Sequence, residues 1–132
     1  MVSYGYNSQY RPPAPLVHVN LRSPEVTGES LELPALLDTA ADRSVVPEEV
    51  VEELGLVKLD EILVAGVGGS LHTVPTYLVQ LQVRQQPTLA VEVAAVQGEG
   101  LILLGRDVLN RFRVLLDGPE LKLKIGQAGE VL

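Results

Sequence analysis

The chain has 132 residues, a formal net charge of −7 and 46% hydrophobic but only 4% aromatic residues, which predicts one domain with an aliphatic core. The absence of cysteine excludes disulfides, thiolate metal sites and a cysteine nucleophile, and the acidic charge argues against nucleic acid as a partner. No segment reaches the roughly 20 consecutive apolar residues of a membrane-spanning helix and no signal peptide is recognised, so we expect a cytoplasmic protein without membrane contact.

The N-terminal residues 1–15 are polar and rich in proline, which predicts a flexible or extended arm. From Leu16 onward, apolar residues recur at every second position and turn residues separate the runs. This pattern predicts antiparallel β-structure. The alternating runs lie at 16–21, 31–37, 77–83, 89–93 and 121–125.

Two segments have the pattern of a helix. "PEEVVEEL" at 47–54 begins with proline, carries acidic residues in its first turn and stops before Gly55. "RDVLNRF" after Gly105 predicts a helix of one or two turns. We therefore expect a mainly β domain over 16–126, with the arm 1–15 before it and a tail over 127–132.

The first stretch with chemical interest is "LLDTAAD", in which Asp38 follows an apolar strand. A carboxylate at the end of a buried strand is costly unless it has a partner or a use. One interpretation is a polar turn, because turn aspartates often bind nearby backbone amides. The other is a catalytic carboxylate, with Thr39 fixing the loop and Ala40 and Ala41 leaving space beside it.

The second stretch, "LVAGVGGSLHTVPTY", places Gly66, Gly68 and Gly69 between two strand-like runs and predicts a hairpin whose tip could fold over an extended ligand. It fails as a phosphate loop, because no lysine follows the last glycine, and as a dinucleotide fingerprint. The histidines, His18 and His72, have no metal-ligand spacing, so we expect no metal site.

The third stretch, "GLILLGRDVLNRF", runs from an apolar strand into Gly105 and a short helix that carries Arg106 and Asp107. The simplest interpretation is a tight junction with surface charges. The functional alternative gives Arg106 a buried ion-pair partner that supports the site.

In order and spacing, "LLDTAAD", "GVGG" and "ILLGRDVL" resemble the motifs of the retropepsins, the single-domain aspartic proteases of retroviruses and their cellular and bacterial relatives. The resemblance spans roughly residues 16–125. It implies a closed antiparallel β-barrel of the acid-protease type, with one short C-terminal helix and one helix or turn near 47–54. The chain departs from the family at Ala40, where the family has glycine.

An aspartic protease needs two adjacent carboxylates that share one proton. The chain has one Asp-Thr motif, so a complete site requires a second copy, most simply in a two-fold homodimer. The resemblance implies that Asp38, Thr39 and Ala40 form the catalytic loop, that Thr39 locks the two loops across the dimer, and that no cofactor is needed. The C-terminal "LKLKI" is a suitable strand for an intersubunit sheet.

The resemblance also assigns substrate contacts. Asp42 would pair with Arg106 and contact the substrate backbone together with Ala41, and a flap tip would cover the peptide; the tip residues are Val67, Gly68 and Gly69. An extended peptide bound in this way adds as a strand, and side-chain pockets then decide specificity. We expect apolar residues to line these pockets, among them Leu36, Val45, Ile62 and Val67.

Three functions remain open at this point. The leading one is an aspartic endopeptidase that cuts extended peptide segments, with its own exposed "QYRPPAP" as one possible substrate or tether. The second is a retropepsin-like module that dimerises or binds peptides without turnover, which Ala40 favours. The third, a β-barrel that binds a small ligand, is supported only by the general β pattern.

Overall fold

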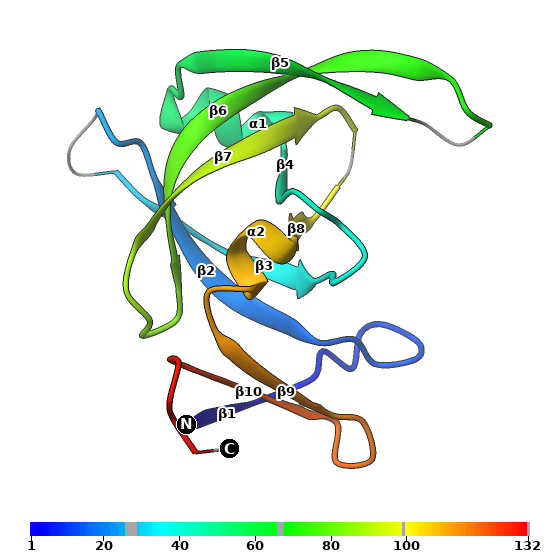
Figure 1. Ribbon diagram of the computed structural model, residues 1–132, viewed down its shortest axis with the longest axis vertical. Helices are drawn as coiled ribbons and strands as arrows, with labels where there is room; N and C mark the ends of the chain where they lie inside the picture. Colours follow the sequence, from blue (N-terminus) through cyan, green and yellow to red (C-terminus); the bar gives the residue numbers. More distant parts are fainter. Residues whose placement is uncertain (26–28, 66–67, 99, 132) are drawn as a thin grey trace.

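The computed structural model describes residues 1–25, 29–65, 68–98 and 100–131. This part of the chain is mainly β, with two short helices beside the strands (Figure 1). The strands are β1 (Val2–Gly5), β2 (Leu16–Arg22), β3 (Leu31–Leu37), β4 (Val45–Pro47), β5 (Lys58–Ala65), β6 (Leu71–Val83), β7 (Leu89–Val96), β8 (Ile102–Leu104), β9 (Arg113–Asp117) and β10 (Lys122–Gly126), and the helices are α1 (Glu48–Leu54) and α2 (Arg106–Leu109).

Six strands close into a barrel in the order β2-β3-β8-β4-β7-β6, and β2 pairs back with β6 to complete it. The expected closed β-barrel is confirmed. Most pairings are antiparallel, but β3 runs parallel to β8 and β4 runs parallel to β7. The alternating pattern predicts strands without specifying their partners, so these two parallel pairings could not be read from it.

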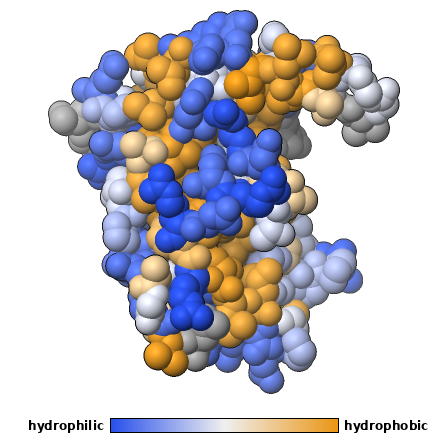
Figure 2. Space-filling model, viewed as in Figure 1, coloured by the Kyte–Doolittle hydropathy of each residue, from blue (hydrophilic) through white to orange (hydrophobic). Residues whose placement is uncertain are grey.

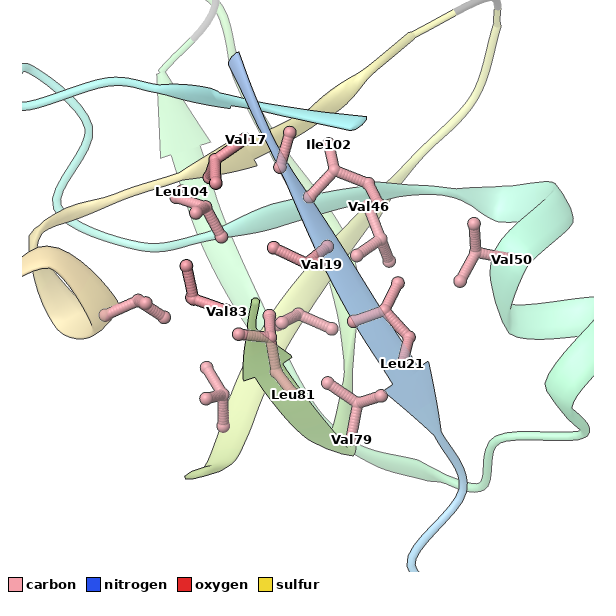
Figure 3. Packing of buried hydrophobic residues seen from close by; sticks show 14 of the residues in the cluster. Val17, Val19, Leu21, Val46, Val50, Val79, Leu81, Val83, Ile102 and Leu104 are labelled. Carbon is pink, nitrogen blue, oxygen red and sulfur yellow. The ribbon is translucent and has the colours of Figure 1, made fainter. Parts of the chain in front are cut away.

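The barrel core is aliphatic, as the composition predicts. One face of β2 points inward with Val17, Val19 and Leu21, and the neighbouring strand β6 contributes Leu81 and Val83 (Figure 3). The same cluster includes Val46, Val79, Val93, Ile102 and Leu104, each at most 2% exposed. Period-2 alternation therefore identified the buried faces of the strands correctly.

Both expected helices are present. Helix α1 buries Val50, Val51 and Leu54 against the core and ends at Gly55, whose φ of 61° is the left-handed conformation that glycine adopts at helix ends. Helix α2 is a single turn that follows Gly105. No helix in the described ranges is long and apolar enough to cross a membrane.

A second, smaller sheet has the order β1-β10-β9 and lies at the end of the barrel where both termini are found (Figure 1). Of the flexible or extended arm predicted for residues 1–15, Val2–Gly5 is an extended strand that pairs with β10. Tyr4 and Tyr6 pack against the core, and the Arg84 guanidinium lies 4.5 Å from the centre of the Tyr4 ring. The polar composition hid this strand, because backbone pairing and two tyrosines order it without an apolar run.

Strand β5 pairs with the first half of β6, and the resulting hairpin extends beyond the barrel (Figure 1). One face of the hairpin is partly covered and carries Ile62, Val64 and Val74. The opposite face is exposed, and its Leu63 and Leu71 side chains are 66% and 69% exposed. Figure 2 shows apolar side chains gathered on this projecting hairpin.

Candidate active site

Asp38 lies directly after β3, at the surface of the barrel. Its N–H donates to the carbonyl of Leu104 at 2.9 Å, so the pairing of β3 with β8 continues through it. Because side chains alternate along a strand, Asp38 shares a face with Leu36 and points away from the core residue Leu37. The side chain is half-buried, and its Oδ1 accepts a hydrogen bond from the Ala40 N–H at 3.0 Å. The carboxylate is thus supported by its own loop while one side stays open.

The loop after Asp38 lies against the start of α2. The Arg106 N–H donates to the carbonyl of Ala41 at 2.9 Å, and the Arg106 Nη1 donates to the carbonyl of Thr39 at 2.8 Å. The Ala41 N–H donates back to the carbonyl of Asp38 at 3.2 Å. The structure therefore brings together two of the three stretches that the sequence analysis selected, "LLDTAAD" and "ILLGRDVL".

Gly105 has no room for a side chain. A Cβ at this position would lie 2.8 Å from the backbone carbon of Arg43 and 2.9 Å from the carbonyl oxygen of Ala41. Its φ of −86° is ordinary, so close packing of backbone on backbone, and not backbone conformation, requires glycine here.

The hydrogen bonds of Ser44 form a brace at the far end of the loop that the sequence motifs did not predict. Ser44 is fully buried, and its hydroxyl group donates to Asp107 Oδ1 at 2.7 Å. The Ser44 Oγ in turn accepts a hydrogen bond from the Gly105 N–H at 2.9 Å. The Ser44 N–H also donates to Asp107 Oδ2 at 3.0 Å. The one sequence signal was a serine next to an apolar strand, which by itself does not identify a partner 63 positions away.

We expect Ser44→Ala to lower the free energy of unfolding by about 1–3 kcal/mol, because it leaves the buried Gly105 N–H without an acceptor. Urea denaturation measures the change. Ser30→Ala, at an exposed serine, is the matched control and should stay within about 0.5 kcal/mol of the parent. Equal stability of the two variants would show that the brace contributes nothing.

The predicted ion pair between Asp42 and Arg106 is not formed. Both side chains are exposed, and no ion pair joins them in the described part of the chain. Arg106 instead reaches across the loop to the Thr39 carbonyl. The sequence predicted the neighbourhood of the two residues correctly, but the direction of an exposed side chain depends on the acceptors around it.

Another ion pair lies beside the loop. Arg43 Nη1 is 3.5 Å from Glu92 Oε1, and the other carboxylate oxygen of Glu92 accepts a 2.7 Å hydrogen bond from the hydroxyl of Thr76. Thr76 is fully buried on β6, close to the point where the pairing of this strand with β5 ends. The contacts of Glu92 therefore connect the loop to the β5–β6 hairpin.

An apolar wall lies on the same face as Asp38. Leu36 on β3 is paired with Leu103 on β8, which in turn is paired with Val45 on β4. All three side chains are half-buried, whereas their chain neighbours Leu37 and Leu104 are buried in the core. Leu36 and Val45 were expected near the site; Leu103 was missed, although the run "LILL" already contained alternate inward and outward positions.

The second stretch, "LVAGVGGSLHTVPTY", belongs to the β5–β6 hairpin. Gly68 and Gly69 are exposed, with φ of 88° and 82°, a conformation that side chains disfavour and that explains the glycines. Gly66 and Val67 lie outside the described residues. Ile62, another expected pocket residue, lies on the partly covered face of the hairpin.

No group of three or more His, Cys, Asp or Glu side chains that could hold a metal ion occurs among the described residues. His18 lies 3.5 Å from Glu32 on the neighbouring strand, and His72 is exposed on β6.

The barrel places the protein in the class of the retropepsin-like aspartic proteases. A family model described as "gag-polyprotein putative aspartyl protease" matches residues 25–111, and the chain belongs to this family. No curated protein sequence matches the chain.

Solved structures show the same fold. A retropepsin-like aspartic protease from Rickettsia conorii aligns with a TM-score of 0.62 and 14% identity over 96% of this chain and 90% of that one. EIAV protease, solved with the inhibitor HBY-793, aligns with a TM-score of 0.55 and 23% identity over 81% and 92% of the two chains. Simian foamy virus (mac) protease aligns with a TM-score of 0.53 and 20% identity over 73% and 92%. At these identities the likeness supports the fold alone.

Proposed function

We propose that the protein is an aspartic endopeptidase in which Asp38 supplies one half of a carboxylate dyad and a second copy of the chain supplies the other. The observation that carries the proposal is the position of Asp38. Its half-buried carboxylate follows a barrel strand, is held by the Ala40 N–H and shares a face with the apolar residues Leu36 and Leu103. Membership of the aspartyl protease family supports it.

The chemistry needs only the two carboxylates and a water molecule. The charged carboxylate takes a proton from the water molecule while the water oxygen attacks the scissile carbonyl carbon. The protonated carboxyl group gives its proton to the carbonyl oxygen. The carbon–nitrogen bond then breaks while the leaving nitrogen takes a proton from the dyad. Two adjacent carboxylates repel each other when both are charged, so one proton shared between them stabilises the pair.

A homodimer follows from the single Asp-Thr motif in the chain. The strand "LKLKI" was expected to join an intersubunit sheet, but β10 already pairs with β1 on one side and β9 on the other. Its hydrogen-bonding edges are used within one subunit. In the described small sheet the edge strands are β1 and β9, and exposed Val2 and Leu116 lie on them. We therefore place the intersubunit contact at one of these two edges.

We further propose that the β5–β6 hairpin is a flap. Its partly covered face, with Ile62 and Val64, would lie over a peptide bound in extended form, and Gly68 and Gly69 near the tip would contact the peptide backbone. Asp42, exposed at the end of the catalytic loop, and Ala41 would bind further backbone groups. The wall formed by Leu36, Val45 and Leu103 would select apolar side chains.

The test is cleavage of a peptide library at mildly acidic pH with and without a statine-type transition-state mimic, combined with light scattering at micromolar concentration. We expect inhibitor-sensitive cleavage next to apolar residues by a dimer. A strict monomer that cleaves peptides would contradict the shared dyad.

Ala40 replaces the family's glycine, and the structure shows that this causes no backbone strain. Among the described residues, the non-glycine positions with positive φ are Arg84 and Leu121, so Ala40 is not in the left-handed region. The side chain is exposed beside the Asp38 carboxylate, where its methyl group would crowd the substrate backbone. The fold is therefore expected to tolerate Ala40 while catalysis is slowed.

We expect Ala40→Gly to raise kcat/KM by about tenfold, equivalent to roughly 1.4 kcal/mol of transition-state binding, with an unchanged melting temperature. Both forms are compared on one peptide at the same pH, and Ala128→Gly in the C-terminal tail is the control. Equal and efficient cleavage by both forms would refute crowding. If neither form cleaves while the dimer is intact, this outcome supports the second candidate, a dimeric peptide-binding module without turnover.

A further inference from the structure

A groove of about 320 Å³ lies between helix α1 and the first residues of strands β3 and β8. It is separate from the candidate active site, because Asp38 follows the far end of β3. Along a strand, the five positions from Leu33 to Asp38 span about 17 Å. Its lining includes Leu33, Glu49, Val50, Glu53, Leu101 and Ile102.

The floor of the groove is apolar. Val50 and Ile102 at its base are 5% and 2% exposed, and Leu31, Leu33 and Leu101 are half-buried around them. Its volume is at the lower end of the roughly 300–1,000 Å³ range of ligand pockets. Ligand binding to a groove of this kind is favourable because apolar side chains of the ligand cover those of the groove and remove both from water.

The rim of the groove is acidic. Glu49 and Glu53 are exposed and lie one turn apart on α1, so their carboxylates share one side of the helix. The helix also carries Glu48 and Glu52 and has no basic residue in its last turn. The ion pairs found in the described ranges use Glu130, Glu32, Glu92 and Glu61, so none neutralises this helix.

We propose that this groove binds a short segment of a partner protein in which apolar side chains stand next to lysine or arginine. The apolar floor would take the aliphatic side chains, and the two rim carboxylates would take the cation, bidentately if it is arginine. Charge complementarity determines which segment binds. The acidic rim attracts basic segments and repels acidic ones, and both effects contribute to selectivity.

The site is independent of the proposed peptidase activity, since none of its lining residues belongs to the Asp38 loop. Binding is therefore measured on the full-length Asp38→Asn variant, which removes cleavage as a complication. The probe is the peptide acetyl-Ala-Leu-Lys-Pro-Leu-Arg-Ala-amide, and the matched peptide has glutamate in place of lysine and arginine. Calorimetry gives Kd, and amide shifts in NMR spectra give the location.

We expect the basic peptide to bind at least about tenfold more tightly than the acidic one, with affinity that falls as salt is raised and with amide shifts at Leu33, Val50 and Leu101. Glu49→Lys combined with Glu53→Lys should weaken the basic peptide about tenfold or more. Glu52→Lys is the matched control, because Glu52 is exposed on the same helix but does not line the groove. The milder Glu49→Gln and Glu53→Gln pair should show the same direction if the lysine variant is unstable.

Three results would overturn the proposal. One is equal affinity for the basic and acidic peptides, and another is amide shifts confined to the Asp38 loop. The third is self-association of the chain that the Glu49→Lys and Glu53→Lys pair abolishes, because a second copy, through a segment such as exposed Arg11, would then be the occupant.

Discussion

Asp38→Asn is expected to reduce kcat/KM by about four orders of magnitude while leaving the fold and the dimer intact. An amide has nearly the shape of a carboxylate and can still accept the Ala40 N–H that holds Asp38 Oδ1. It cannot take a proton from water or share one with its counterpart. In the proposed dimer both halves of the dyad change together, so no partial site remains.

The variant should be at least as stable as the parent, because two carboxylates forced together in the dimer repel one another. Peptide hydrolysis, thermal unfolding and light scattering are measured on the same preparation. Asp117→Asn, at the last residue of β9, makes the same change in charge and should keep full activity. Hydrolysis near the parent level in Asp38→Asn would mean that another group activates the water.

Much of the fold was predictable because burial of one strand face produces a period of two residues in the sequence. Strands that bury one face show apolar residues at every second position, and the segments at 16–21 and 77–83 do form the walls of the barrel. Pairing partners carry no such signal. The parallel contact between β3 and β8 joins segments more than 60 positions apart, and β1 is held mainly by backbone hydrogen bonds to β10.

For the candidate site, the sequence predicted which segments adjoin but not which side chains make the contacts. Motif order indicated that the Asp38 loop and the Gly105–Arg106 junction belong together, and they do adjoin. The individual contacts differ, since the carboxylate that braces the loop is Asp107 through Ser44, whereas Asp42 is exposed. Which acid in "DTAAD" or "GRD" turns inward depends on the hydrogen-bond donors around it, and those come from distant parts of the chain.

Gly105→Ala is expected to cost about 3 kcal/mol in the free energy of unfolding, at the upper end for overpacking. The new methyl group would lie within 3 Å of backbone atoms of Arg43 and Ala41, and backbone cannot rotate away as a flexible side chain can. The loop must therefore move, and Asp38 moves with it. A displacement of about 1 Å at a catalytic group can cost about 100-fold in rate, so kcat/KM should fall further than the loss of folded protein explains.

Gly118→Ala is the matched control for this substitution. Among the described residues, no atom beyond the two chain neighbours lies within 4 Å of a Cβ at Gly118, and its φ is not positive, so the stability should change by no more than about 0.5 kcal/mol. Urea denaturation of both variants measures the difference, and activity is compared under conditions where each is fully folded. If Gly105→Ala matches Gly118→Ala in both stability and kcat/KM, the close approach of the two backbones does not position Asp38. If stability alone falls, the junction supports the barrel, and the geometry of the catalytic loop is set by the Arg106 contacts instead.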